Sequence, residues 1–353
     1  MKILLIQTGF LGDVVLSTPV IAALADKYPG SQISFLTTPQ AAGMVQHHPQ
    51  VEETLVFDKR GSQSGWSGLF RMAAEIRARK FDAVFSLHKS WRTTALVLLS
   101  GIPKRYGFRQ AKAAFVYSAA AERRDLKHEV LRNLAVMRAV GFEPSELPQT
   151  MHIEIPPDVS DSVLKHLTVF PEQGFVAVAP GSVWATKRWT PEGFAAAAQR
   201  LIADGYGIVI LGGPADSGAA ESLQALLATS AGKVVNLAGE TSLLESAAVI
   251  ACAKLLISND SAPLHIASAV GTPVVAVFCA TVPEFGFGPW GVASECVGLN
   301  NLECRPCARH GGNTCPLGTY ACQRDLPPEH VYAAAKRVVR GGEGSPVKVP
   351  GGV

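Results

Sequence analysis

Short apolar runs alternate along this chain with longer amphipathic stretches. In the first half the apolar runs are residues 2–7, 32–38, 54–58 and 82–87, and the amphipathic stretches are residues 13–28 and 69–80. Apolar runs of this length between turn residues predict buried strands, and the amphipathic stretches predict helices. Because strands alternate with helices, the pattern predicts a parallel sheet covered by helices on both faces.

The same alternation restarts after a proline-rich stretch, residues 143–160, which predicts a linker. The predicted strands of the second half are residues 175–180, 207–213, 233–239, 255–259 and 272–278, and the predicted helices are residues 190–205, 243–254 and 261–270. Thr190 is the expected N-cap of the first of these helices, with Pro191 at its first position. We therefore expect two α/β domains, residues 1–155 and 156–340, and a disordered tail over residues 341–353.

Composition limits the cellular setting and the kind of partner. No apolar stretch approaches the ~20 residues of a membrane helix, and the first apolar run is too short for a secretion signal, so we expect a cytoplasmic protein. Residues 59–132 hold 16 lysines and arginines against 5 acidic residues, which predicts either an anionic partner or a solvated basic surface. The pI of about 8.4 argues against nucleic acid and favours a smaller anion or an anionic lipid surface.

The first strand runs into the loop TGFLGD, residues 8–13, which ends at Asp13. This loop matches neither the GxGxxG fingerprint nor a P-loop, because its glycines stand only at positions 9 and 12 and no GK[ST] follows. Asp13 stands at the head of a predicted helix. It is therefore either a helix cap or a carboxylate with a chemical role.

Two loops of the second half have polar residues where a strand ends and a helix begins. In residues 258–273, Asn259 and Asp260 precede a helix on which Ser261 and His265 share one face. The free N–H groups at such a helix start can bind an anion, and the alternative is a capped helix with a core histidine.

In residues 179–194, Lys187 and Arg188 stand between two tryptophans. Two cations beside a strand end suit a diphosphate. The alternative is a solvated loop with two surface cations.

Three segments together resemble glycosyltransferase family 9, the bacterial lipopolysaccharide core heptosyltransferases. They are GDVVLSTPVIAAL near the start, PGSVWATKRW in the middle and SNDSAPLHIASAVGTPVVAVF late in the chain. The TKRW loop and the late cysteine-rich segment look most like the heptosyltransferase II branch. The resemblance implies a GT-B architecture, in which two Rossmann-like α/β/α domains face a central cleft. It also implies inverting, metal-independent transfer of heptose.

The resemblance also implies roles for individual residues. Asp13 matches the catalytic base of the family, and Lys187 matches the lysine on the donor diphosphate. The donor-binding residues would be Thr186, Lys187, Arg188, Asp260, Ser261, Ala262 and His265. Ala262 stands where the family motif often has glycine. The acceptor is anionic, and the candidates to meet it are Gly12, Lys59, Arg60, Arg92 and Arg105.

Four cysteines, Cys304, Cys307, Cys315 and Cys322, are spaced in a way that favours structural zinc over disulfides in a cytoplasmic chain. The last two gaps are wider than in well-known zinc ribbons, and reduced thiols in a packed loop or a redox role are the alternatives. No cofactor is expected for catalysis.

The resemblance implies ADP-L-glycero-D-manno-heptose as the donor and heptosyl-Kdo2-lipid A as the acceptor, with no nucleic acid partner. A lipid acceptor would also allow peripheral contact with the inner membrane. The alternatives are the first heptosyltransferase, which acts on Kdo2-lipid A, and a GT-B enzyme with another nucleotide sugar. A non-catalytic nucleotide- or glycan-binding protein is a further alternative.

Overall fold

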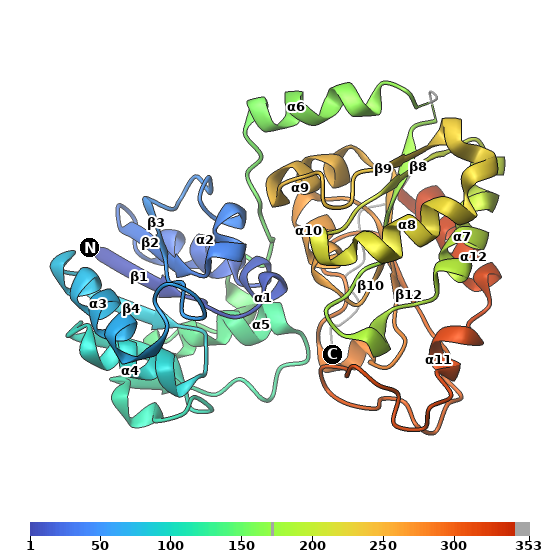
Figure 1. Cartoon of the computed structure of the whole chain (residues 1–353). Coiled ribbons are helices and arrows are strands. Elements are labelled where there is room, and N and C mark those ends of the chain that lie inside the picture. The colour runs from blue at the N-terminus through green and yellow to red at the C-terminus, as the bar shows by residue number, and fades with distance from the viewer. Residues whose placement is uncertain (171–172, 343–353) are drawn as a thin grey trace. The chain divides into compact units, whose positions relative to one another are not determined.

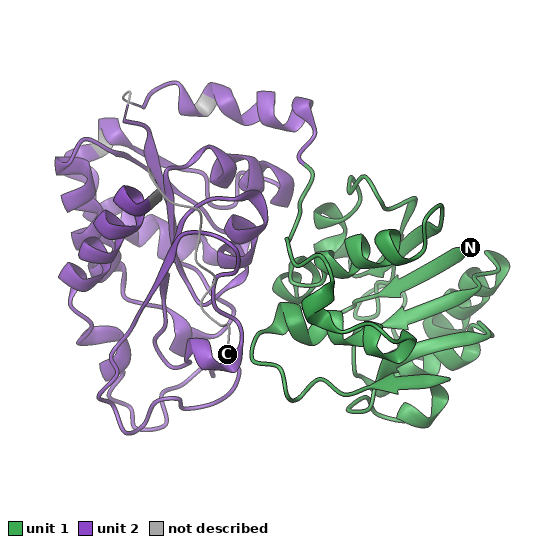
Figure 2. Cartoon of the chain, turned by 180° about the vertical axis from the view of Figure 1, so that it is seen from behind, with its two compact units in different colours: residues 1–154 green, residues 155–353 purple. Residues whose placement is uncertain are grey.

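The computed structural model of the chain describes residues 1–170 and 173–342, and the chain divides into two compact units. Unit 1 is Met1–Glu154, and unit 2 begins at Ile155 (Figures 1 and 2). Each unit has its own parallel sheet and its own apolar core. Within the described residues, no helix combines the length and the apolar character needed to cross a membrane.

Unit 1 contains a six-stranded parallel sheet of order β3-β2-β1-β4-β5-β6. Its strands are β1 (Lys2–Ile6), β2 (Gln32–Thr37), β3 (Glu53–Val56), β4 (Ala83–Ser86), β5 (Lys104–Phe108) and β6 (Ala119–Ala121). Its helices are α1 (Leu11–Val15), α2 (Thr18–Lys27), α3 (Gly65–Ala78), α4 (Trp91–Leu99) and α5 (Glu129–Leu134).

Unit 2 repeats this topology, with the order β12-β11-β10-β7-β8-β9. Its strands are β7 (Phe175–Ala179), β8 (Gly207–Ile210), β9 (Val234–Asn236), β10 (Leu255–Asn259), β11 (Val274–Val277) and β12 (Ser294–Val297). Its helices are α6 (Pro157–Leu167), α7 (Pro191–Ala203), α8 (Ser217–Leu226), α9 (Leu243–Cys252), α10 (Ala262–Val270), α11 (Ala321–Arg324) and α12 (Pro328–Gly342).

Both sheets therefore have the strand order of a Rossmann-like fold, which confirms the expectation of two such halves. The order reverses between β1 and β4 in unit 1 and between β7 and β10 in unit 2. Loops on either side of such a reversal leave the sheet in opposite directions, so a crevice opens at the carboxyl ends of the two strands. Asp13 follows β1, and Lys187 and Asp260 follow β7 and β10.

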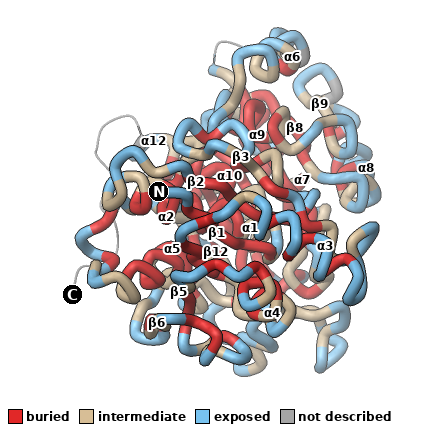
Figure 3. Tube along the Cα trace, turned by 90° about the vertical axis from the view of Figure 1, so that its left-hand side faces the viewer, coloured by how far each residue is buried: buried red, intermediate tan, exposed pale blue. Residues whose placement is uncertain are grey.

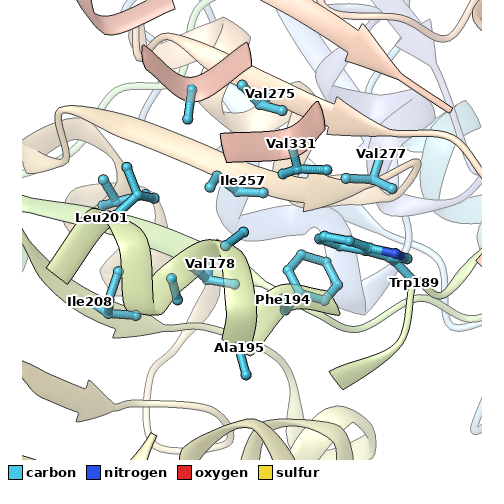
Figure 4. Packing of buried hydrophobic residues seen from close by; sticks show 14 of the residues in the cluster. Val178, Trp189, Phe194, Ala195, Leu201, Ile208, Ile257, Val275, Val277 and Val331 are labelled. Atoms are coloured by element: carbon cyan, nitrogen blue, oxygen red, sulfur yellow. The ribbon is translucent and has the colours of Figure 1, made fainter. Parts of the chain in front are cut away.

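The central strands are buried along nearly their whole length, because helices cover both faces of each sheet (Figure 3). In unit 2, Trp189 and Phe194 pack edge to face with ring centroids 5.0 Å apart, beside Leu201, Ile257 and Val277 (Figure 4). Thr190 caps α7 through a 3.1 Å bond from the Gly193 N–H, as the sequence predicts. This cap fixes the start of the helix that contributes Phe194 and Leu201 to the core.

The predicted helix over residues 13–28 is wrong in one respect, because the structure has two helices there, α1 and α2. Pro19 has no N–H to donate to the carbonyl of Val15, and that carbonyl accepts a 2.9 Å bond from the Thr18 hydroxyl instead. The chain turns at Leu16 and Ser17, so Asp13 sits on a separate short helix.

Two further expectations also need correction. The predicted linker, residues 143–160, contains the start of α6, where Pro157 takes a first-turn position that needs no N–H. The predicted tail begins too early, because Gly341 and Gly342 belong to α12, and residues 343–353 lie outside the described part of the chain.

Replacing Phe194 with alanine should lower the free energy of unfolding by about 3–5 kcal/mol, because a buried aromatic ring is lost and a cavity remains. Urea denaturation followed by circular dichroism measures this change. The matched control is Leu226→Ala on α8, an exposed position where we expect a change within about 0.5 kcal/mol. Equal shifts for the two variants would contradict the packing described here.

Candidate functional site

Asp13 lies in the first turn of α1, just beyond the carboxyl end of β1. Its Oδ2 accepts a 2.9 Å hydrogen bond from the Phe10 N–H. The chain approaches this carboxylate closely at Gly9, where an added Cβ would lie 2.6 Å from Asp13 Oδ2. Asp13 therefore does hold the helix start, as the cap interpretation requires. A carboxylate has a second oxygen, so this bond does not exhaust its capacity to accept protons or hydrogen bonds.

The environment of Asp13 makes its carboxylate more basic than usual. Burial raises the pKa of Asp13 to about 6, and the charge of Glu129 adds to this effect. The Phe10 N–H and the positive charges of Lys89 and Arg123 act in the opposite direction and hold the pKa down. At pH 7 the group is therefore mostly ionised, yet it binds a proton more readily than an exposed aspartate.

Glu129 and Arg123 form a buried ion pair near this site. The Arg123 guanidinium also lies over the Phe108 ring, 4.6 Å from its centroid. The Asn133 side chain donates a 3.1 Å bond to the carbonyl of Leu16 and so ties α5 to the end of α1. The sequence analysis missed Arg123 and Glu129. They lie more than one hundred positions after Asp13, and no local sequence pattern connects residues so far apart.

A second group of side chains connects β1 with β4 across the strand-order reversal. His88 Nδ1 lies 3.1 Å from Thr8 Oγ1 and 2.8 Å from Thr93 Oγ1. Burial and the positive charges of Lys59, Lys89 and Arg60 lower the pKa of His88 to about 4. This imidazole is therefore neutral at pH 7. The sequence analysis missed Thr8 and His88, although each follows the carboxyl end of a strand, and it missed Thr93 in the first turn of α4.

Three of the predicted acceptor-binding cations gather at this edge of unit 1. Lys59 donates a 2.5 Å hydrogen bond to the carbonyl of Thr8, and burial together with Arg60 and Arg92 lowers the pKa of Lys59 to about 8. Arg60 lies over the Phe10 ring at 5.7 Å. A cluster of cations with a depressed lysine pKa favours the binding of an anion.

The other two predicted acceptor residues differ in their placement. Gly12 is part of α1, immediately before Asp13. Arg105 lies early in β5, where it pairs with Val84, so it is away from the carboxyl edge. Its guanidinium donates to the carbonyls of Val116 at 2.7 Å and Ile102 at 2.9 Å. The structure thus does not bring Arg105 together with Lys59 and Arg60.

In unit 2 a buried ion pair spans the strand-order reversal. Lys187, in the loop after β7, lies 2.6 Å from the Oδ2 atom of Asp260, which directly follows β10. The Thr281 hydroxyl, from the loop after β11, donates a 2.6 Å bond to the same oxygen. Three neighbouring strand ends therefore meet at one carboxylate. The sequence analysis identified Lys187 and Asp260, but it missed Thr281.

Asn259 holds the Lys187 loop in place. It is fully buried, its Oδ1 accepts a 2.9 Å bond from the Trp189 N–H, and its Nδ2 donates a 2.7 Å bond to the carbonyl of Pro180. Asn259 thus closes both ends of the loop onto β10. We therefore assign it a positioning role, not a binding one.

The two residues next to Lys187 make hydrogen bonds that stabilise the conformation of the same loop. Arg188 Nε donates a 2.8 Å bond to the carbonyl of Ser182. Thr186 Oγ1 accepts a 2.8 Å bond from the Gly312 N–H, and the Thr186 N–H donates to the Gly312 carbonyl at 2.9 Å. Thr186, Lys187 and Arg188 are the donor-binding residues predicted in this loop. Of these three, Lys187 is the one whose charged group reaches Asp260 at the strand-order reversal.

The start of α10 differs from the capped-helix alternative. Ser261 occupies the N-cap position, but its side chain makes no capping bond and lies 3.3 Å from Ser258 Oγ instead. The Asp260 carboxylate pairs with Lys187, so it is not a cap either. Ala262 is the first residue of α10, and His265 is buried on the same helix, one turn beyond Ser261. In the first turn of α10, Pro263 has no N–H and the Leu264 N–H donates a 3.2 Å bond to the Ser261 carbonyl, so the Ala262 N–H is the donor that can meet an anion.

The four clustered cysteines lie in the segment that contacts the Lys187 loop through Gly312. All are free thiols in this structure, and Cys304 and Cys307 contact each other. Within residues 1–170 and 173–342, no three His, Cys, Asp or Glu side chains are grouped as a metal site requires. Structural zinc at these cysteines therefore stays a sequence prediction.

Comparisons with known proteins agree with one another. A family model described as glycosyltransferase family 9 (heptosyltransferase) matches residues 69–320. Lipopolysaccharide heptosyltransferase 2 of Salmonella typhimurium is 26% identical over 294 residues, which are 81% of this chain and 84% of that protein. Lipopolysaccharide heptosyltransferase 3 of Escherichia coli is 28% identical over 293 residues, 80% of this chain and 84% of that protein.

The likeness extends to a solved structure, that of ADP-heptose lipopolysaccharide heptosyltransferase II from Escherichia coli. It matches with a TM-score of 0.81 at 23% identity and covers 98% of this chain and 100% of that chain. This likeness shows the fold, which is the GT-B architecture of two Rossmann-like domains that the sequence implied.

The Asp13 carboxyl carbon should titrate near pH 6, and Glu129→Gln should move that titration to lower pH, because it removes a negative charge that disfavours ionisation. Carbon-13 NMR of aspartate-labelled protein measures both, with Asp13→Asn to assign the resonance. The matched control is Glu75→Gln on α3, whose carboxylate pairs with Arg79. A titration at the ordinary value of 3.8, or equal shifts in the two Gln variants, would contradict this description.

Proposed function

Because the chain belongs to glycosyltransferase family 9, we propose that this glycosyltransferase is a heptosyltransferase of lipopolysaccharide core biosynthesis. The donor would be ADP-L-glycero-D-manno-heptose and the acceptor heptosyl-Kdo2-lipid A. The observation that carries the proposed chemistry is the Asp13 carboxylate, half-buried at a strand end with its pKa raised to about 6. The similarity to lipopolysaccharide heptosyltransferases supports the sugar and the acceptor class.

The reaction we propose is a single displacement with inversion. Asp13 takes the proton from an acceptor hydroxyl while the hydroxyl oxygen attacks the anomeric carbon of the heptose. The bond from that carbon to the diphosphate oxygen breaks, and ADP leaves with the bonding electrons. A carboxylate with a pKa near 6 is ionised at neutral pH and is still basic enough to share the proton during the attack.

Unit 2 would hold the ADP part of the donor. Lys187 has three N–H donors, and Asp260 occupies one of them through the 2.6 Å contact. The remaining donors can meet a diphosphate, and the Ala262 N–H at the start of α10 can add one more. Lys187 would thereby stabilise the charge that develops on the leaving diphosphate, which is the task a metal ion performs in many other transferases. The proposal therefore includes metal-independent transfer.

Lys59 and Arg60 would meet the acceptor, whose Kdo sugars and phosphates are anionic. Lys59 interacts electrostatically with Asp13, so an acceptor bound there would stand beside the proposed base. Arg92 belongs to the same basic cluster. Arg105 is not among the proposed acceptor-binding residues, because it lies early in β5 and away from the carboxyl edge where Lys59, Arg60 and Arg92 gather.

A mass-shift assay tests the proposal directly. We expect the protein and ADP-L-glycero-D-manno-heptose to add one heptose to heptosyl-Kdo2-lipid A, whereas Asp13→Asn should transfer at least ~100-fold more slowly and still bind ADP. Below pH 6 the native kcat/KM should fall as Asp13 becomes protonated. A gain only on Kdo2-lipid A would make the protein the first transferase, and native transfer by Asp13→Asn would remove Asp13 from the chemistry.

Replacing Lys187 with methionine should weaken ADP binding by ~1.5–3 kcal/mol, the range for hydrogen bonds to charged groups. Isothermal titration calorimetry measures this loss. The matched control is Lys233→Met in unit 2, an exposed lysine that should leave ADP affinity unchanged. Equal affinities for the Lys187 variant and the native protein would remove Lys187 from the donor site.

A further inference from the structure

Three large aromatic side chains form an exposed cluster on unit 1. Trp66 and Phe70, one turn apart on α3, stack with ring centroids 6.2 Å apart, and Trp91 on α4 lies 5.5 Å from Trp66. Their exposed fractions are 60%, 53% and 50%, respectively. We call this group the aromatic surface. Exposed clusters of this kind mark sites that meet an apolar partner, because leaving them in water is unfavourable.

Two further apolar side chains extend the aromatic surface along α4. Leu98 stands seven residues after Trp91 and so on the same face of the helix, and it is 53% exposed. Phe115 is 88% exposed and belongs to the short 3₁₀ turn Ala114–Val116, which contacts α4. Exposed apolar side chains therefore stand on α3, on α4 and on the turn after β5.

Hydrogen bonds at the helix starts hold the tryptophans in place. Arg92 donates to the carbonyls of Gln63 and Gly65, both at 2.9 Å, and so joins the start of α4 to the start of α3. Ser90 caps α4 by accepting a 3.2 Å bond from the Thr93 N–H. The aromatic surface is thus built by a defined scaffold and does not result from a frayed helix end.

The segment of the chain that carries the aromatic surface has an excess of positive charge. Residues 65–115 contain 10 lysines and arginines against 2 acidic residues. Asp82 accepts a 2.7 Å bond from the Lys2 N–H before β4 begins, and Glu75 pairs with Arg79, so both acids are engaged. In the sequence a basic residue directly follows two of the aromatic ones: Arg71 follows Phe70, and Arg92 follows Trp91.

We propose that the aromatic surface docks this protein on a lipid bilayer that carries anionic phospholipids. Tryptophan favours the boundary between lipid headgroups and acyl chains, because its ring is apolar and its N–H can still meet water or a headgroup. Lysine and arginine beside the rings are attracted to anionic headgroups. The exposed aromatic rings and the excess of basic residues occur together on two packed helices. A protein partner would not require such an excess of one charge.

Docking there would also orient the chain. Trp66 and Trp91 are at the starts of α3 and α4, the helices that follow β3 and β4, so they lie toward the carboxyl edge of the sheet. Asp13 lies at the same edge, after β1. A lipid-linked acceptor would then reach Asp13 without leaving the bilayer, a consequence that rests on the proposed function, whereas the docking itself does not.

Vesicle flotation tests the docking alone, with vesicles that contain no lipopolysaccharide. We expect the full chain to float with phosphatidylcholine vesicles that contain phosphatidylglycerol, to bind pure phosphatidylcholine weakly, and to lose binding as salt rises. Trp66→Ser with Trp91→Ser should lower the bound fraction by roughly fivefold or more. The matched control is Leu226→Ser, an exposed helical position of unit 2, which should bind like the native chain.

Two measurements separate docking from misfolding. The Ser variant should keep the native circular dichroism spectrum and thermal midpoint. The Trp66→Phe with Trp91→Phe variant should keep vesicle binding but lose most of the tryptophan quenching by brominated lipids, because Phe keeps the apolar contact and removes the reporter.

Three results would overturn the proposal. They are no flotation of the native chain with anionic vesicles, native flotation of the Ser variant, and a concentration-dependent dimer that the Ser variant abolishes. The last of these would assign the aromatic surface to a second copy of the chain.

Discussion

The reversal of strand order in each parallel sheet is the constraint on which both parts of the site depend. Where two neighbouring parallel strands are followed by loops that run to the same face of the sheet, the loop of one strand covers the carboxyl end of the other. Only where the order reverses do two loops diverge and leave polar groups room beside a strand end. Thr8 meets His88 at one reversal, and Lys187 meets Asp260 at the other. The two units place polar chemistry at equivalent positions because they share one topology.

Burial at these positions raises the free energy of a charged group, because the group loses its contact with water, unless another group compensates the charge. Asp260 is almost fully buried, and it is compensated by the ammonium of Lys187 and the hydroxyl of Thr281. Asn259, equally buried, uses both ends of its amide to hold the loop that carries Lys187. The loop can therefore be long and still present its lysine at a fixed place, which a solvated loop could not do.

The sequence predicted the features that a local pattern encodes. The apolar runs of β1, β2, β7 and β10 and the Thr190 cap are visible because burial and capping select residue types over a few positions. The short strands β5, β6 and β12 escaped prediction, since each has few large apolar residues in a row and is held as a strand by pairing with its neighbours. Glu129, His88 and Thr281 were missed for a related reason, because only the fold brings them to Asp13, Thr8 and Asp260.

Asp13 shows why those missed residues matter. Burial alone favours the neutral form of a carboxyl group, and a base that stayed protonated at neutral pH could not accept a proton. The Phe10 N–H, Lys89 and Arg123 hold the pKa down, whereas Glu129 and desolvation push it up, and the balance falls near 6. The cap bond that first offers a purely structural explanation for Asp13 is thus one of the interactions that keep its carboxylate ionised. The cap and the base are therefore compatible roles of a single side chain.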